Sequence, residues 1–392
     1  PPVAGRRRPP SRDEGPRLPR DFFERPTDAD AILGRVAWPK ISNECPVFDP
    51  LHVVYNRIPK CGSGSVQVFV EGAQARNDFQ FCRSKLYSKR ALRDGRAVEG
   101  YVKDPFRASS CRRKIDPKQR ALLNRHVFFV DFGARAAKAV AAPPFDKPRG
   151  VAYVNVLRDP IKRCVSRFYY ERDARGLFRR GAAFTLDECM DGGHAACTFQ
   201  RWRGDASVAA GRGYTRARQF TEECASNYLT RWFCGHGGAC KPERGALGLD
   251  HLEGALDARR REASREMLEA AAANALRYPV GLLDRMDDSL RLFATTLPAF
   301  FGGWDGVPPC NKCGGRTNAT RPPPNPVHRR ILEHVNALDV SLYAFAERAF
   351  DRRFRACFPN KDAGQVRRAL PAAPPPPVAP PPVASPPVAP PP

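Results

Sequence analysis

Residues 51–70, LHVVYNRIPKCGSGSVQVFV, decide the fold of this chain. Residues 51–56 form a short apolar run rich in β-branched side chains, which predicts a buried strand. Small residues follow at 61–65, and an apolar pattern that predicts a helix resumes at Val66. A strand, a loop of small residues and a helix N-terminus together favour anion binding, because the loop N–H groups and the positive end of the helix dipole face one point.

The side chains of this loop suit an anion. Ser63 and Ser65 add hydroxyl donors, Gly62 and Gly64 let the backbone approach closely, and Lys60 supplies a point charge. The alternative is a strand that ends in a Gly/Ser turn beside a solvated lysine. The Gly-x4-Gly-Lys-[Ser/Thr] order of a Walker A loop is absent.

The composition of the 392 residues is strongly basic. Lys and Arg number 65 against 41 Asp and Glu, which gives a formal charge of +24. A basic leader contributes, but arginine clusters recur at 172–180 and 258–265. This charge suits a polyanionic partner such as nucleic acid, an acidic lipid surface or an acidic polysaccharide.

The 13 cysteines are many for a cytosolic enzyme. Cys189 and Cys197 lie eight residues apart, and Cys234 and Cys240 lie six apart, each pair across loop-like sequence containing glycine. These pairs predict small disulfide-closed loops in an oxidising compartment. Zinc is the alternative, although neither pair has ligand spacing; residues 310–313 do have CxxC spacing, without a second such pair.

Two further features concern the secretory pathway. Asn318 begins an Asn-Ala-Thr glycosylation sequon in a Pro-rich stretch that we expect to be exposed. No apolar run approaches 18 residues, so any membrane anchor is expected outside this chain.

Continuous apolar runs that alternate with helical patterns predict an α/β fold with a central parallel sheet flanked by helices. Asp159 and Pro160 supply the cap and first position of one helix. Strands are predicted at 51–56, 126–132, 151–157 and 278–283, and helices at 66–70 onward, 161–172, 253–276, 286–299 and 327–352. The domain division predicted is a disordered basic leader at 1–45, one folded domain at 46–360, and a disordered Pro/Ala/Val-rich tail at 361–392.

Two more features that could carry chemistry involve Arg158, Ser166 and His126. Arg158 ends one strand and Ser166 lies on the next helix, facing the crevice where α/β folds bind ligands. His126 lies beside another predicted strand. The alternatives are an ion-paired Arg158, a surface serine and a structural histidine. Together with the 57–65 loop, they suggest a nucleotide with two separated phosphates, and a base for an acceptor hydroxyl.

Several segments resemble the uronyl 2-O-sulfotransferases, which act on heparan and on chondroitin or dermatan chains. Coverage runs over about residues 50–355, in the same order along the chain. The similar segments are YNRIPK at 55–60 (5′-phosphosulfate loop), HVFFVDF at 126–132 (catalytic histidine), VNVLRDPI at 154–161 with Ser166 (3′-phosphate motif), the two cysteine loops, and GLLD at 281–284.

The resemblance implies a P-loop-like sulfotransferase fold with disulfide-stapled loops. The donor would be 3′-phosphoadenosine 5′-phosphosulfate, and the acceptor the 2-hydroxyl of a uronic acid in a glycosaminoglycan-like polysaccharide. It implies no metal and no nucleic-acid partner. It also implies a Golgi-lumenal type II membrane protein whose anchor is absent from this chain.

The resemblance also implies a role for each site residue. The reaction would be an in-line displacement in which His126 takes the proton of the acceptor hydroxyl. An imidazole with a pKa near ~6.5 can do so at neutral pH. Lys60 would neutralise the charge that grows on the departing phosphate oxygen. Arg158 and Ser166 would bind the 3′-phosphate. The 5′-phosphosulfate would be held by Lys60, Cys61, Gly62, Ser63, Gly64 and Ser65, and the acceptor by Arg57, Arg175, Arg179 and Arg180.

The chain departs from the heparan-type members at four positions: Cys61, Gly64, Asn124 and Arg167. Asn124 replaces a second histidine, and Arg167 replaces an aromatic acceptor contact. The resemblance assigns no partner to the other nine cysteines. Two other functions remain open: a kinase-like nucleotide-dependent transferase, and a non-catalytic module that binds polyanions by charge alone.

Overall fold

The computed structural model describes most of the predicted folded domain. The described residues are 45–84, 95–106, 109–111, 119–132, 150–175, 184–192, 197, 220, 223–224, 227–236, 240, 258–303 and 321–360. The predicted leader up to residue 44, the tail at 361–392, the CxxC at 310–313 and the sequon at Asn318 lie outside them.

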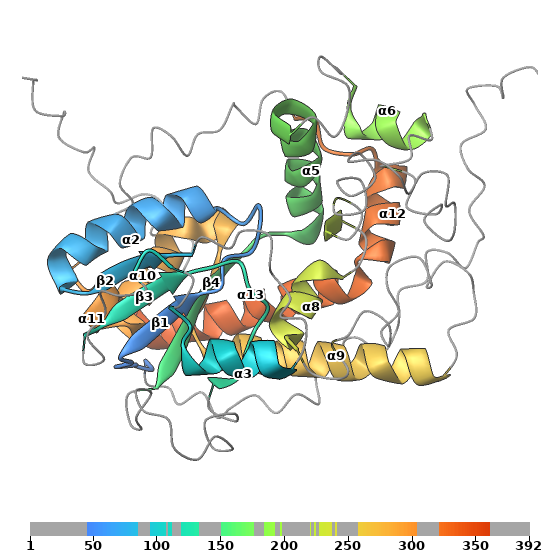
Figure 1. Cartoon of the computed structure of the whole chain (residues 1–392). Coiled ribbons are helices and arrows are strands. Elements are labelled where there is room, and N and C mark those ends of the chain that lie inside the picture. The colour runs from blue at the N-terminus through green and yellow to red at the C-terminus, as the bar shows by residue number, and fades with distance from the viewer. Residues whose placement is uncertain are drawn as a thin grey trace, which may run out of the picture.

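The sheet has five parallel strands in the order β2-β3-β1-β4-β5 (Figure 1). The strands are β1 (His52–Tyr55), β2 (Gln80–Arg83), β3 (Ala121–Asn124), β4 (Val151–Leu157) and β5 (Val280–Leu282). β1 is the middle strand, and its Tyr55 is level with Asn124 of β3 and Val154 of β4. The predicted central parallel sheet flanked by helices is confirmed.

Helices flank the sheet and extend beyond it on one side, where α5, α6 and α12 lie (Figure 1). They are α2 (Ser63–Asn77), α3 (Gly95–Lys103), α5 (Pro160–Tyr170), α6 (Leu186–Asp191), α8 (Tyr228–Cys234), α9 (Ala258–Arg277), α10 (Met286–Thr296), α11 (Pro298–Phe301), α12 (Pro326–Val335) and α13 (Ala337–Cys357), with short helical turns at Glu171–Arg175 and Leu283–Arg285. None of the described helices is both long and apolar enough to cross a membrane.

Alternation along β1 divides the core between the two faces of the sheet. Val53 and Tyr55 pack in a cluster with α2, α10 and α11, whereas Val54 packs in a second cluster with α3. Successive side chains of a strand point to opposite faces, so a strand buried on both faces is apolar throughout. This explains the uninterrupted apolar run that predicted β1.

A third cluster joins α8, α9 and α13 beside β5. The buried carboxylate of Asp339 accepts hydrogen bonds from the backbone N–H groups of Leu229 and Thr230, at 2.9 and 2.8 Å. These N–H groups belong to the first turn of α8, where no carbonyl of the helix can reach them. Desolvation by burial raises the pKa of Asp339, although Arg163 and these donors oppose the rise. The contacts fix α8 against α13.

The predicted strand at 126–132 is wrong. The strand of this region is β3, which ends before His126, while residues 125–131 have no regular structure. The segment is apolar because Val127, Phe129 and Val130 are buried over the α3 face of the sheet. An apolar run alone did not distinguish a strand from an extended segment that covers one. The final predicted helix is likewise two helices, α12 and α13, which meet at Asn336.

Five disulfides lie among the described residues, three between distant segments and two within short loops. The pairs are Cys45–Cys357, Cys82–Cys111, Cys164–Cys224, Cys189–Cys197 and Cys234–Cys240. Both small loops predicted from the sequence are therefore present. Three longer links were not predicted, and Cys61 is a buried free thiol.

The longest link makes a testable contribution to stability. Cys45–Cys357 closes a loop of 312 residues, which restricts the unfolded chain and contributes about 5 kcal/mol on chain-entropy grounds. A Cys45→Ser/Cys357→Ser variant should lower the free energy of unfolding by several kcal/mol in denaturant titrations. Cys61→Ala, which removes an unpaired thiol, is the control. An unchanged unfolding midpoint in the double variant would contradict this contribution.

Candidate functional site

The strand order places a topological switch point at the carboxyl ends of β1 and β4, and the region between residues 56–62 and 158–166 is called the crevice below. The chain leaves β1 through α2 toward β2 at one edge of the sheet. It leaves β4 toward β5 at the opposite edge. Adjacent strands whose connections diverge leave an opening, and α/β proteins bind ligands there. Residues 56–62 follow β1 at this point, and Arg158 and Asp159 follow β4.

The backbone after β1 turns sharply into α2. Lys60 has φ +67°, a conformation that residues with a side chain rarely adopt, and Gly62 has φ +72°. Gly62 also lacks space for a side chain, because a Cβ there would lie 2.4 Å from Cδ1 of Leu283. A strained lysine beside an obligatory glycine indicates a functional turn.

The N-terminus of α2 is suited to bind an anion. Gly62 occupies the cap position without a side-chain hydrogen bond, and the first turn contains no acidic residue. Ser63 and Ser65 are half-buried there, and Gly64 is exposed. The first N–H groups of a helix have no partner within it and carry the positive end of the dipole. The predicted loop therefore has the geometry that the anion hypothesis requires.

Side chains from three other segments hold the carbonyl groups of this turn. The Asn56 carbonyl accepts from Trp232 Nε1 at 2.8 Å and from Asn155 Nδ2 at 3.1 Å. The Lys60 carbonyl accepts from a guanidinium nitrogen of Arg158 at 3.3 Å. The Arg57 carbonyl lies 2.6 Å from Nδ1 of His126. Although His126 follows β3 rather than opening a strand, it is therefore tied to the same turn as Lys60.

The contact with Arg57 determines which nitrogen of His126 is basic. A carbonyl oxygen can only accept a hydrogen bond, so the neutral ring donates from Nδ1. The lone pair of the ring is then on Nε2, which is the nitrogen that can take a proton.

Lys60 is partly buried among other cations. Its Nζ lies 4.3 Å from the centre of the Tyr170 ring. Burial lowers the pKa of Lys60 to about 8, with further lowering by Arg321, Arg167 and Arg158 and an opposing effect of Glu171. A bound anion would raise the pKa of Lys60 and favour its charged form, so the electrostatics of these cations favour anion binding.

Arg158 and Ser166 lie on the other side of the crevice. Arg158 is half-buried, and desolvation lowers its pKa. Ser166 is buried on α5. That helix begins as predicted, with Pro160 in its first turn and the Asp159 carboxylate accepting from the Lys162 N–H at 2.8 Å.

Of the remaining predicted site residues, Cys61 and Arg57 are buried, and the side chains of the others are not described. Cys61 is buried, and burial raises its thiol pKa to about 11, so at neutral pH the thiol stays protonated and only its backbone faces the loop. Arg57 is also buried. The side chain of Arg175 and all of Arg179 and Arg180 lie outside the described residues.

Sequence reasoning missed several residues of this site. Arg321, just before α12, acts electrostatically on both Lys60 and Arg158. Arg167 is buried and forms ion pairs with Glu171 at 2.6 Å and Glu223 at 3.1 Å. No local pattern joins Arg321 or Glu223 to the 57–65 loop, because only the folded chain brings them near it. Tyr170 continues the α5 pattern and was detectable only as a helix residue.

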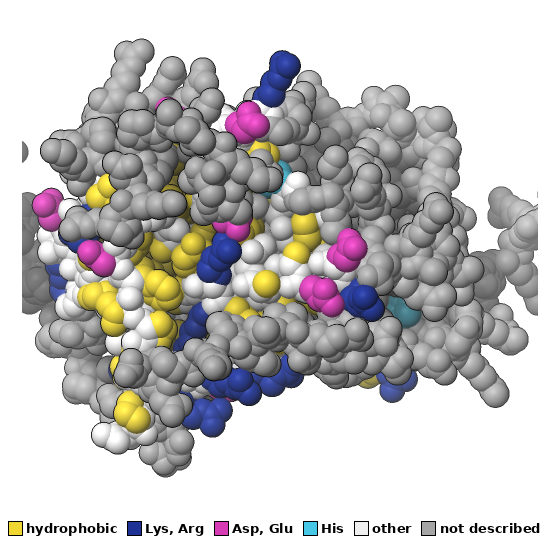
Figure 2. All heavy atoms as spheres, turned by 90° about the horizontal axis from the view of Figure 1, so that it is seen from below, with side chains coloured by type: hydrophobic (Ala, Val, Ile, Leu, Met, Phe, Trp, Pro, Cys, Tyr) yellow, Lys and Arg dark blue, Asp and Glu magenta, His cyan; other side chains and the backbone are white. Residues whose placement is uncertain are grey.

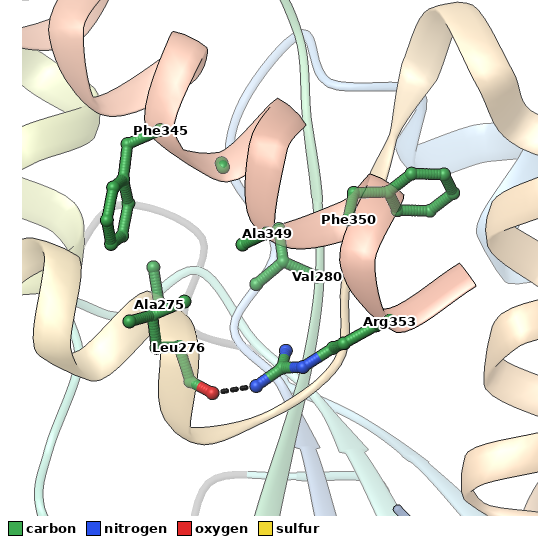
Figure 3. A pocket seen from close by; sticks show the side chains of 8 residues that line it. Ala275, Leu276, Val280, Phe345, Ala349, Phe350 and Arg353 are labelled. Carbon is green, nitrogen blue, oxygen red and sulfur yellow. Dashed lines mark hydrogen bonds between the residues drawn. The ribbon is translucent and has the colours of Figure 1, made fainter. Parts of the chain in front are cut away.

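A pocket elsewhere in the molecule is structural (Figure 3). It is a cavity of about 10 Å³ between α9, β5 and α13, lined mainly by aliphatic and aromatic side chains. Arg353 points into it and donates to the carbonyls of Leu276 and Tyr278, where α9 ends. Basic side chains near a helix C-terminus often cap its last carbonyls.

The chain is similar to two kinds of curated protein, while no family model matches it. Uronyl 2-sulfotransferase of Mus musculus is 24% identical over 321 residues, which are 77% of this chain and 62% of that protein. Heparan sulfate 2-O-sulfotransferase 1 of Xenopus laevis is 26% identical over 260 residues, 64% of this chain and 56% of that protein. The chain is therefore similar in sequence to the uronyl and heparan sulfate 2-O-sulfotransferases.

A third relative extends this likeness. Heparan sulfate 2-O-sulfotransferase 1 of Gallus gallus is 25% identical over 264 residues, 65% of this chain and 57% of that protein. The chain thus spans 56 to 62% of the length of these three 2-O-sulfotransferases.

The lowered pKa of Lys60 predicts proton uptake on binding a dianion. At pH 8 about half of Lys60 is neutral, and a phosphate at the loop should protonate it. Calorimetry with adenosine 3′,5′-bisphosphate, in buffers of different ionisation enthalpy, should show uptake that Lys60→Arg lacks because guanidinium stays charged. Affinity of the wild type should fall as pH rises from 7 to 9. Equal proton uptake by both proteins would remove Lys60 from the anion site.

Proposed function

We propose that this chain is a sulfotransferase that uses 3′-phosphoadenosine 5′-phosphosulfate. It transfers the sulfuryl group to the 2-hydroxyl of a uronic acid in a glycosaminoglycan-like polysaccharide. The observation that carries the proposal is the turn between β1 and α2, which bears Lys60 and binds His126 through the Arg57 carbonyl. The relatives' names and the five-stranded parallel sheet support it, the latter within a P-loop-like sulfotransferase fold.

The donor fits the described residues at two places. The uncapped N-terminus of α2, with Ser63 and Ser65, suits a 5′-phosphosulfate. Arg158 and Ser166 suit a 3′-phosphate on the opposite side of the crevice. Two separated anion sites favour a bisphosphate nucleotide over one with a single phosphate chain, and the absent Walker A order argues against a kinase.

The reaction would be an in-line displacement at sulfur. Nε2 of His126 takes the proton of the acceptor hydroxyl as the new O–S bond forms. Lys60 neutralises the charge that develops on the departing phosphate oxygen as the old S–O bond breaks. The donor supplies the sulfuryl group, and no metal takes part in these steps.

The proposal of a polyanionic acceptor rests on the positive charge of the protein. Lys and Arg side chains gather along one edge of the face seen from below, whereas Asp and Glu are scattered (Figure 2). With a net charge of +24, the protein suits a polyanionic chain. Arg57, Arg175, Arg179 and Arg180 are the proposed partners of its carboxylates and sulfates, by bidentate hydrogen bonds. The disulfides agree with the oxidising Golgi lumen as the compartment.

The test is transfer from ³⁵S-labelled donor to a panel of glycosaminoglycans, followed by disaccharide analysis. Wild-type protein should label the 2-position of a uronic acid. Retained binding of polysaccharide without transfer would favour a non-catalytic polyanion-binding module, and labelling at another hydroxyl would refute the proposed acceptor.

His126→Ala should abolish transfer, because the Arg57 carbonyl holds His126 at the turn with Nε2 as the basic nitrogen. Binding of adenosine 3′,5′-bisphosphate and the melting temperature should change little, since the side chain is half-buried. His328→Ala, which removes a histidine on α12 paired with Asp187, is the control and should retain transfer. A folded His126→Ala protein that transfers at the wild-type rate would exclude His126 as the base.

A further inference from the structure

Trp232 contacts the turn and the base segment in three ways. Its indole N–H donates to the Asn56 carbonyl at 2.8 Å, immediately before Arg57. Its ring meets the His126 ring edge-to-face, with centroids 6.4 Å apart and planes at 90°. Its backbone carbonyl accepts from the N–H of Phe129 at 2.8 Å, three residues beyond His126.

These contacts have a rigid support. Trp232 is fully buried on α8, whose N-terminus is held by Asp339. The ring of Phe128 packs edge-to-face against the indole, with centroids 5.1 Å apart. Asn155 is the second donor to the Asn56 carbonyl and also donates to the Asn56 side chain at 2.7 Å. The indole therefore lies between two rigid elements, the sheet and α8.

We infer that Trp232 is the positioning residue of the site, which holds the His126 ring and the Lys60 turn in one fixed relation. This inference rests on the proposed function, because it assigns a role in transfer. A buried indole N–H needs an acceptor in any protein. In this site the acceptor is the Asn56 carbonyl of the turn, and the same ring contacts His126, so one side chain joins the turn to the base. The indole N–H holds the Asn56 carbonyl, and the next carbonyl along the chain, that of Arg57, accepts the hydrogen bond from Nδ1 of His126.

The consequence for the reaction is geometric. If the turn shifts, the Arg57 carbonyl no longer selects the Nδ1–H form of His126, and the basic lone pair is no longer always on Nε2. A misplacement of about 1 Å can reduce a rate by about 10²-fold. Donor binding depends on α2 and α5 instead, so it should be spared.

The test compares Trp232→Phe with Phe233→Leu. Phenylalanine at 232 keeps an aromatic ring but removes the N–H, whereas the control truncates the next buried residue on α8, which makes no side-chain hydrogen bond. Trp232→Phe should lower kcat for sulfate transfer about 10- to 100-fold with KM for the donor within twofold, and Phe233→Leu should leave both near wild type.

A second readout does not depend on activity. ¹⁵N NMR of the histidine rings distinguishes the two neutral tautomers, and the His126 signal is assigned from its absence in His126→Gln. His126 should be in the Nδ1–H form in wild type and Phe233→Leu, and should gain the Nε2–H form in Trp232→Phe.

The possible outcomes separate the two claims. An unchanged tautomer in Trp232→Phe overturns the inference, even if kcat falls, because the loss would then be one of folding or packing. Matching kcat in both variants also overturns it. A wild type that transfers no sulfate to any acceptor refutes the proposed function, and the tautomer comparison then decides the inference by itself.

Discussion

The site depends on the seven residues between β1 and α2, residues 56–62, whose peptide groups serve two purposes. Three of the carbonyls in this turn are occupied by Trp232, His126 and Arg158, which come from α8, the segment after β3 and the end of β4. At the N-terminus of α2 the turn presents N–H groups instead. The carbonyls of the segment accept hydrogen bonds from side chains of the protein, and the first N–H groups of α2 remain for an anion. One short segment can therefore bind an anion and position a base.

The electrostatics of the crevice follow from burial. The pKa values of Lys60 and Arg158 are lowered mainly by desolvation, and Arg321 lowers both further. Arg167 differs, because Glu171 and Glu223 neutralise it inside the protein. The positive charge that remains is therefore concentrated at the turn and at the start of α5, on the two sides of the opening. Partly buried cations cost desolvation free energy in the free protein. A ligand with two separated negative groups would offset that cost by pairing with them.

Much of this organisation could be predicted from local sequence. The apolar run before residue 56, the cap at Asp159 and the cysteine loops each depend on neighbours within a few residues. The prediction of a strand at 126–132 was wrong because a segment that packs over a sheet needs the same apolar side chains as a strand buried within one. Trp232, Arg321 and the Cys45–Cys357 link could not be predicted, since their partners are distant in sequence and are brought near only by the fold.

The most direct measurement of this account is a crystal structure with adenosine 3′,5′-bisphosphate bound. The account predicts the 5′-phosphate at the backbone N–H groups of residues 62–65, within reach of Lys60, and the 3′-phosphate between Arg158 and Ser166. Nε2 of His126 should face the 5′-phosphate, where the sulfuryl group would lie. A nucleotide bound away from the crevice of β1 and β4, or one whose 5′-phosphate points away from His126, would contradict it.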